Sequence, residues 1–230
     1  MTVSNLSTGM RPGVCLSTSR PTVPYVGQTI FETDTNKLLV WNGTAWVIPN
    51  SPAQNPQGLE LVTTVTCTSG GTASGGVITI GSAQSSVVVE TAFSSAYNNY
   101  RIVTNGMVFS VLGSAVYLKL SGSTGSTYYG NMIYNVPSTS AIGGVSDANG
   151  TSNGLFLMTS SQTTATDSDG TLTNPFISSV SNFFGNYSGR SYNGQSSSHD
   201  NNAASSTGFT IAPGSGTITG GTIRVYGYRN

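Results

Sequence analysis

The stretch 207–230 reads TGFTIAPGSGTITGGTIRVYGYRN and decides the fold class of the chain. It predicts two short strands around a Pro-Gly turn. From Gly221 onward apolar and polar residues alternate, which is typical of a strand. One side would carry Ile223, Val225 and Gly227, and the other would carry Thr222, Arg224, Tyr226 and Tyr228. Because a loose tail would leave its apolar residues in water, we expect this stretch to close a β-sandwich that begins upstream.

The same alternation recurs from residue 59 onward, and no segment carries an apolar stripe with helical spacing. It is cleanest in 115–120, where aliphatic side chains would lie on one face. The run 154–159 is apolar throughout and is predicted to be a strand buried on both faces. The predicted fold is all-β, with a C-terminal antiparallel β-sandwich, jelly-roll-like, over 59–230.

Turn signals divide these strands. Asn105-Gly106 predicts a hairpin between strands at 100–104 and 107–112. The Ser- and Asn-rich stretch 186–206 predicts a long surface loop or a ragged strand pair. Within the sandwich, 163–170 and 187–202 are the loops that we expect at the surface.

The N-terminal part predicts a small three-stranded β-meander, with strands at 28–32, 37–41 and 45–48. Asn42-Gly43 marks its last hairpin, which carries Trp41 and Trp46, the two tryptophans of the chain. A meander of this size is marginally stable alone. The two indoles are therefore expected to cover the sandwich or another subunit.

Two further segments organise the chain. Residues 1–19 are polar and are expected to be extended and irregular until a partner, or a neighbouring copy of the same chain, orders them. Residues 51–58 form a Pro-rich linker, expected to be stiff and extended. The predicted organisation is an N-terminal region over 1–50, the linker, and the sandwich domain over 59–230.

Composition excludes several classes of function. Charged residues make up 7% of the chain, and eight Lys and Arg balance eight Asp and Glu. Nucleic-acid binders usually carry a basic field, so we expect no nucleic-acid partner. The N-terminus lacks a signal-peptide pattern, and no apolar run is long enough for a membrane span. We expect synthesis in a cytoplasm without export by the standard route. Cys15 and Cys67 either form a disulfide or are two small buried or half-buried side chains.

Little in the sequence indicates catalysis or a cofactor. The one histidine, His199, precedes Asp200 in the Ser- and Asn-rich stretch, where a solvated loop is the simpler interpretation. Asp167 and Asp169 resemble the start of a calcium loop, but Ser178 stands where an EF-hand has its glutamate. No phosphate-binding, dinucleotide-binding or metal-ligand motif is present. We expect a protein that is not an enzyme and has no cofactor.

Two stretches carry a resemblance to a known family. RPTVPYVGQTIFETDTNKLLVWNGTAWV, 20–47, resembles a segment common in phage tail and fibre proteins. AFSSAYNNYRI, 92–102, together with GFTI, 208–211, and GTITGGTIRVYGY, 216–228, resembles the C-terminal domain of tailed-phage virion proteins, those of cyanophages and other marine phages above all.

The resemblance implies a non-enzymatic structural protein of the virion that forms a homotrimer. Its N-terminal region would attach to other virion proteins, with Arg20, Pro21, Trp41 and Trp46 in the attachment segment. Its sandwich would meet a host surface glycan, with candidate recognition residues Tyr187, Tyr192, His199 and Asp200. Tyrosine suits such contacts because it is large, stiff and amphipathic, although packing in the core or between subunits is its commoner use.

Three functions compete. The first is a short tail fibre or receptor-binding protein, and the second is a capsid decoration or head-fibre protein whose first 50 residues grip the shell. The absence of a long shaft between the two parts disfavours a long tail fibre. The third, a polysaccharide-degrading spike, is the weakest. Such enzymes need a carboxylate pair in a groove, usually on a larger β-helix, and this chain has neither the length nor the acids.

Overall fold

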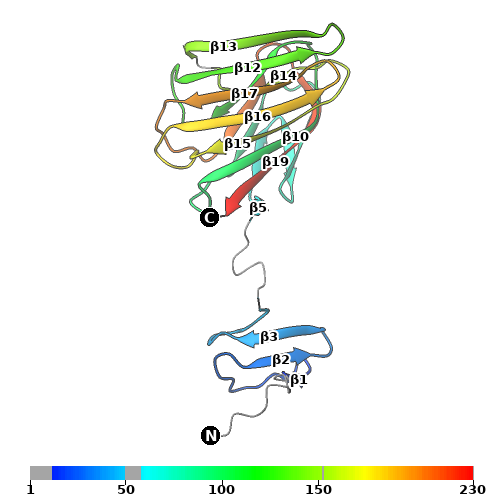
Figure 1. Ribbon diagram of the computed structural model, residues 1–230, viewed down its shortest axis with the longest axis vertical. Helices are drawn as coiled ribbons and strands as arrows, with labels where there is room; N and C mark the ends of the chain where they lie inside the picture. Colours follow the sequence, from blue (N-terminus) through cyan, green and yellow to red (C-terminus); the bar gives the residue numbers. More distant parts are fainter. Residues whose placement is uncertain (1–11, 50–57, 152, 230) are drawn as a thin grey trace. The chain divides into compact units, whose positions relative to one another are not determined.

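The computed structural model describes residues 12–49, 58–151 and 153–229, and every regular element in them is a β-strand. The chain divides into two compact units, Met1–Gln57 and Gly58–Asn230 (Figure 1). The expected linker, 51–58, lies outside the described residues except for Gly58, which begins the first strand of the second unit. Among the described residues there is no helix that could cross a membrane.

The first unit is a four-stranded mixed sheet in the order β1-β2-β3-β4. Its strands are β1 (Gly13–Cys15), β2 (Thr29–Glu32), β3 (Lys37–Trp41) and β4 (Trp46–Val47). The last three form the predicted antiparallel meander. The expectation of an irregular N-terminal segment is wrong for Gly13–Cys15, which pairs in parallel with β2. Residues 1–11 of that segment lie outside the described part of the chain.

The second unit contains a ten-stranded and a five-stranded sheet, which confirms the all-β sandwich. The large sheet contains β5 (Gly58–Leu61), β7 (Gly71–Ser74), β8 (Val77–Ile80), β10 (Asn99–Phe109), β12 (Tyr128–Val136), β13 (Ala141–Thr151), β15 (Thr166–Thr173), β16 (Ser181–Gly189), β17 (Asn193–Asp200) and β19 (Ile218–Arg229). The small sheet contains β6 (Thr66–Ser69), β9 (Val87–Glu90), β11 (Ala115–Leu120), β14 (Leu155–Thr159) and β18 (Phe209–Pro213). The two sheets together contain more strands than the eight of a jelly roll.

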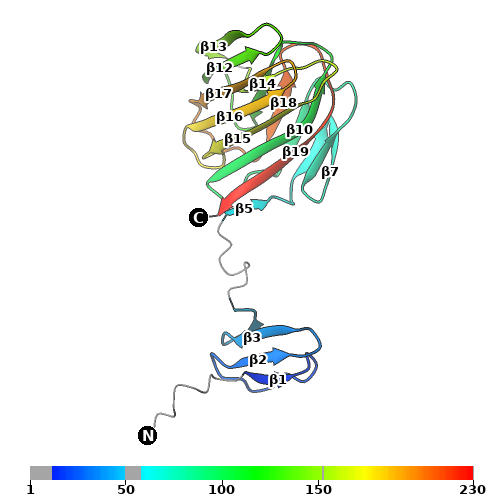
Figure 2. The ribbon, with the colours of Figure 1, turned by 45° about the vertical axis from the view of Figure 1, so that its right-hand side comes forward.

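The strand order is β13-β12-β17-β16-β15-β10-β19-β8-β7 in the large sheet, with β5 also paired to β19, and β14-β11-β18-β9-β6 in the small sheet. The small sheet lies behind the large one, as β14 and β18 show in Figure 2. The core fills the space between them. Ile102 and Val225 from the large sheet and Leu118 and Ile211 from the small sheet are fully buried. All five residues of β14 are buried, as the apolar run predicted.

The closing stretch differs from the prediction in one respect. Its two strands do not pair with each other: β18 lies in the small sheet between β11 and β9, whereas β19 lies in the large sheet beside β10. The predicted faces of β19 are confirmed, because Ile223 and Val225 are buried and Arg224 and Tyr226 are half-exposed. The stretch therefore closes the sandwich by adding one strand to each layer.

The predicted hairpin at Asn105-Gly106 is wrong. Strand β10 runs through these residues, and its register with β15 shifts between Thr104 and Met107, as in a β-bulge. Gly106 has a positive φ of 67°. Its N–H donates to Oδ1 of Asp167 at 2.6 Å. A glycine in the left-handed conformation is found both in β-bulges and in tight turns. Here the pairing with β15 keeps β10 extended through Gly106.

Candidate functional site

The outer face of the large sheet carries one continuous row of side chains across seven strands. Ser146, Asn131, Ser197, Phe184, Thr171, Arg101 and Tyr226 are successive cross-strand partners from β13 to β19. Directly opposite residues in antiparallel strands point to the same face. Phe184 is 56% exposed although it is a phenylalanine. The row therefore presents an aromatic ring among amides and hydroxyls.

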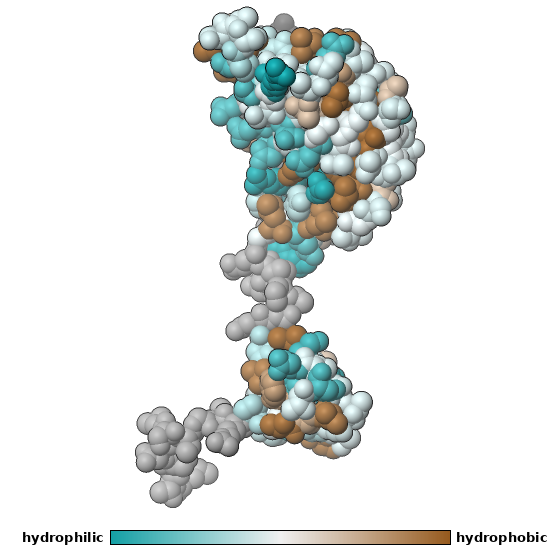
Figure 3. All heavy atoms as spheres, turned by 90° about the vertical axis from the view of Figure 1, so that its right-hand side faces the viewer, coloured by the Kyte–Doolittle hydropathy of each residue, from teal (hydrophilic) through white to brown (hydrophobic). Residues whose placement is uncertain are grey.

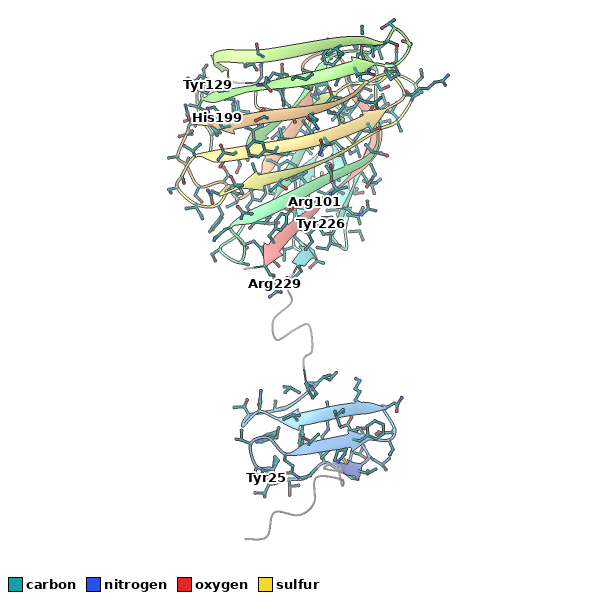
Figure 4. All side chains as sticks on the ribbon, viewed as in Figure 1. Tyr25, Arg101, Tyr129, His199, Tyr226 and Arg229 are labelled. Carbon is teal, nitrogen blue, oxygen red and sulfur yellow. The ribbon has the colours of Figure 1, made fainter. Side chains whose placement is uncertain are left out.

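Two arginines on this face, at the β10 and β19 side, have side-chain partners. Arg101 forms an ion pair with Asp169 on the adjacent strand β15. Arg224 donates to Oδ1 of Asn105 at 3.1 Å. In Figure 4, Arg101 and Tyr226 lie next to each other on β10 and β19, far along the sheet from Tyr129 and His199. In Figure 3, hydrophilic side chains run down the left-hand edge of this unit.

The four predicted recognition residues do not form one surface. The segment 187–202 is largely strand, from β16 and β17, so the expected surface loop is wrong and the alternative of a strand pair holds as far as Asp200. Tyr187 is 4% exposed and Asp200 is 1% exposed, because both side chains point inward. Tyr192 is half-buried and packs edge-on against Tyr134, with ring centroids 5.4 Å apart.

His199 is the one of the four that lies on the outer face. Its ring stacks on Tyr129 of β12 with a centroid distance of 5.3 Å and an interplanar angle of 10° (Figure 4). Tyr187 instead shares a hydrogen bond of 3.0 Å with the buried hydroxyl of Thr159. Burial raises the pKa of Tyr187 to about 12. Tyr187 is therefore a core residue.

The segment 163–170, also expected to be a loop, is mostly strand β15. The two acidic side chains that resemble a calcium loop point outward from this strand and have separate partners, Gly106 for Asp167 and Arg101 for Asp169. Within the described ranges, no group of three His, Cys, Asp or Glu residues could hold a metal ion. Cys15 and Cys67 are free thiols in different units, which leaves the second interpretation of the two cysteines.

The sheet of the first unit has one covered and one open face. The connection between β1 and β2 lies over the covered face, where Ile30 and Leu39 are buried. On that side Arg20 pairs with Glu32, whose side chain is 1% exposed and also accepts a hydrogen bond of 2.6 Å from Thr35. The hydrogen bond from Arg20 is the main reason why the pKa of Glu32 is lowered.

The open face is apolar. The register places Val14, Phe31 and Leu38 in one cross-strand row, and Thr29, Val40 and Val47 in the next. Val14 is 69% exposed and Leu38 is 42% exposed. Figure 3 shows hydrophobic side chains at the surface of this small unit. A sheet this small with an exposed apolar face is a typical site for contact with another protein.

The predicted attachment residues take internal roles on the other side of this sheet. Arg20 neutralises Glu32, and Pro21 follows it in the covering connection. Trp41 and Trp46 are direct cross-strand partners that pack edge-on against each other, with centroids 5.7 Å apart, and both are half-buried. The open-face residues could have been found from the alternation of 29–32 and 37–41 only if the pairing of Gly13–Cys15 had been known.

Comparison of the chain with models of protein families, with curated proteins and with solved structures found no match. The geometry and the side-chain chemistry of the two units are therefore the basis for inferring its function.

Proposed function

We propose that this chain is a non-enzymatic structural protein of a phage virion, a short tail fibre or receptor-binding protein. The 12–49 unit attaches to another virion protein, and the sandwich presents its large sheet to the host surface. The observation that carries the proposal is the open apolar face formed by Val14, Phe31, Leu38, Val40 and Val47. Such a face gains most of its stabilisation by burial against a partner.

The sandwich unit supports the second half of the proposal. Its outer face is broad, carries few unpaired charges and exposes the ring of Phe184 among amides. A surface of this kind makes neutral, hydrogen-bonded contacts.

We further propose that the protein acts as a homotrimer on the virion. A monomeric mass by light scattering at micromolar concentration would contradict the trimer.

The attachment proposal is tested with two matched double variants of the full chain. Val14→Lys/Leu38→Lys places charges on the open face. Val23→Lys/Tyr25→Lys places the same charges on side chains of the covering connection that are 90% and 71% exposed. Copies of the chain per purified virion are counted by quantitative mass spectrometry, and tryptophan emission verifies that the unit is folded.

We expect the open-face variant to lose incorporation on the order of tenfold or more, because each buried charge opposes binding. The connection variant should be incorporated normally. Equal incorporation of both variants, or absence of the wild-type chain from virions, would overturn the proposal. A capsid decoration protein, the alternative, would be present in the many copies that cover a shell rather than the few that a tail tip accommodates.

A further inference from the structure

The outer face of the large sheet is hollowed along a second cross-strand row. Ile133, Gln195, Asn186, Asp169 and Val103 are successive partners from β12 to β10. A hollow of about 330 Å³ lies against Ile133, Gln195 and Asn186, and the exposed ring of Phe184 forms one of its walls. We call this row of side chains, with the hollows over it, the trough.

Two neighbouring hollows extend the trough across the sheet. One, of about 270 Å³, shares Ile133 and Gln195 with the first and reaches Ile142 on β13. The other, of about 260 Å³, shares Asn186 and reaches Val103 on β10. Because strands lie about 4.8 Å apart, six strands give the trough a length of roughly 24 Å. It is long, shallow and perpendicular to the strands, which suits a linear molecule better than a compact one.

The side chains of the trough provide two kinds of contact. Phe184 and Ile133 are 56% and 59% exposed and offer apolar surface. Among the described residues, the amides of Asn131, Asn186 and Gln195 form no hydrogen bond with protein groups. Each free amide can donate two hydrogen bonds and accept two. A pyranose ring matches this pattern, since it has a C–H face and hydroxyl groups that both donate and accept.

The charge of the trough selects among such ligands. The hollows from Ile142 to Phe184 are lined by no charged side chain. At the far end Asp169 is neutralised by Arg101, and Asp167 accepts the N–H of Gly106. Arg224 follows Val103 in the same row and donates to Asn105, so the basic groups near the trough lie at this end. An anionic ligand would find no basic partner from Ile142 to Phe184 and would lose hydration on entering these hollows.

We propose that the trough binds a neutral, linear oligosaccharide, with a sugar ring against Phe184 and hydroxyl groups on Gln195, Asn186 and Asn131. This inference rests on the proposed function and specifies its ligand. A second copy of this chain is a poorer occupant, because the exposed apolar residues are separated by amides and serine, which is depleted in protein interfaces.

The test uses the full chain and saturation-transfer NMR with titration. The probes are linear oligosaccharides of glucose, mannose, galactose and N-acetylglucosamine, with oligogalacturonate and a heparin fragment as charged counterparts. The variants are Phe184→Ala, Gln195→Glu, and the matched Ile177→Ala. Ile177 is 41% exposed but lies in the turn between β15 and β16, away from the trough. Unfolding midpoints verify that each variant is folded.

At least one neutral probe should bind, and both trough variants should weaken it about tenfold while Ile177→Ala leaves it unchanged. The inference is overturned if no neutral probe binds, if a charged probe binds more tightly, or if both trough variants bind like wild type. It is also overturned if Phe184→Ala abolishes self-association, since the trough would then be an interface between copies. A chain that enters virions yet binds no neutral probe refutes this inference alone. A chain that binds a probe but is absent from virions refutes the proposed function alone.

Discussion

The ring of Tyr97 lies directly on the backbone of Gly227, so closely that a Cβ atom at position 227 would overlap the ring. The Tyr97 hydroxyl donates to Oε2 of Glu60 at 2.6 Å, and Arg229 forms an ion pair with the same carboxylate. This contact joins two segments that lie far apart in the sequence, 92–102 and 216–228. It also fixes the strand β5 to the end of β19.

Substituting Gly227→Ala should therefore destabilise the sandwich by about 1–3 kcal/mol, because the ring must move and its bond to Glu60 is lost. Urea unfolding followed by far-UV circular dichroism measures the change. Gly220→Ala, in the same strand, is the matched control, since a Cβ atom there meets nothing within 4 Å. Equal losses in the two variants would contradict the packing role of Gly227.

The first unit should lose stability in acid. The pKa of Glu32 lies below the ordinary glutamate value of about 4.3, so its charge stabilises the folded unit above that pH, and the contribution is lost as the pH falls further. Both tryptophans lie in this unit, so tryptophan emission reports its unfolding alone. Glu32→Gln should lower the unfolding midpoint at neutral pH and flatten its dependence between about pH 5 and 3. Glu90→Gln, in the sandwich, should leave the emission transition unchanged.

The sandwich should instead lose stability in alkali. Burial raises the pKa of Tyr128 and of Tyr187 to about 12. The unfolded chain releases these protons near pH 10, so stability falls between the two values by roughly 1.4 kcal/mol per pH unit for each tyrosine. Tyr187→Phe should cost about 1 kcal/mol at neutral pH, because Thr159 loses its partner, yet show a shallower alkaline slope. An unchanged slope, measured by chemical denaturation from pH 9 to 11.5, would count against this account.

The β-bulge depends on Asp167. Removing its carboxylate in Asp167→Ala leaves the Gly106 N–H without its partner and should cost about 1 kcal/mol. Since Asp167 and Asp169 have separate protein partners, millimolar calcium should not raise the unfolding midpoint of the wild-type chain. A calcium-dependent rise would restore the calcium-loop interpretation. Asp169→Asn should weaken the pair with Arg101 without disturbing the bulge.

The fold was predictable where apolar residues occupy the buried face of a strand and polar residues occupy the exposed face. The aliphatic positions of β11 and β19 alternate, and each of these strands buries the predicted face. Asn105-Gly106 was misread because a left-handed glycine is compatible with both a hairpin and a bulge. The choice depends on Asp167, 61 positions away, which no local pattern could reveal.

The outer face of the large sheet could not be predicted either, because it too depends on pairing between distant segments. Strand β17 reads NGQSSSHD, which contains no β-branched or aliphatic residue, yet it pairs with both β12 and β16 along its whole length. Its inward residues Ser196 and Ser198 are buried because their neighbours in the sheet are in place. Phe184 and Gln195 become part of one surface only through this register, so sequence patterns alone could not unite them.

The position of β5 also determines how the protein responds to a pulling force. Strand β5 is the first strand of the sandwich unit, and it pairs with β19 through four residue pairs that begin at Gly58 and Arg229. A load applied to the chain before Gly58 while the trough is held would act on this short strand first. In an antiparallel pair such a load peels residues away one after another. The carboxylate of Glu60 lies two residues from the point where peeling starts. Its hydrogen bond from Tyr97 and its ion pair with Arg229 would have to break before β5 separates further from β19.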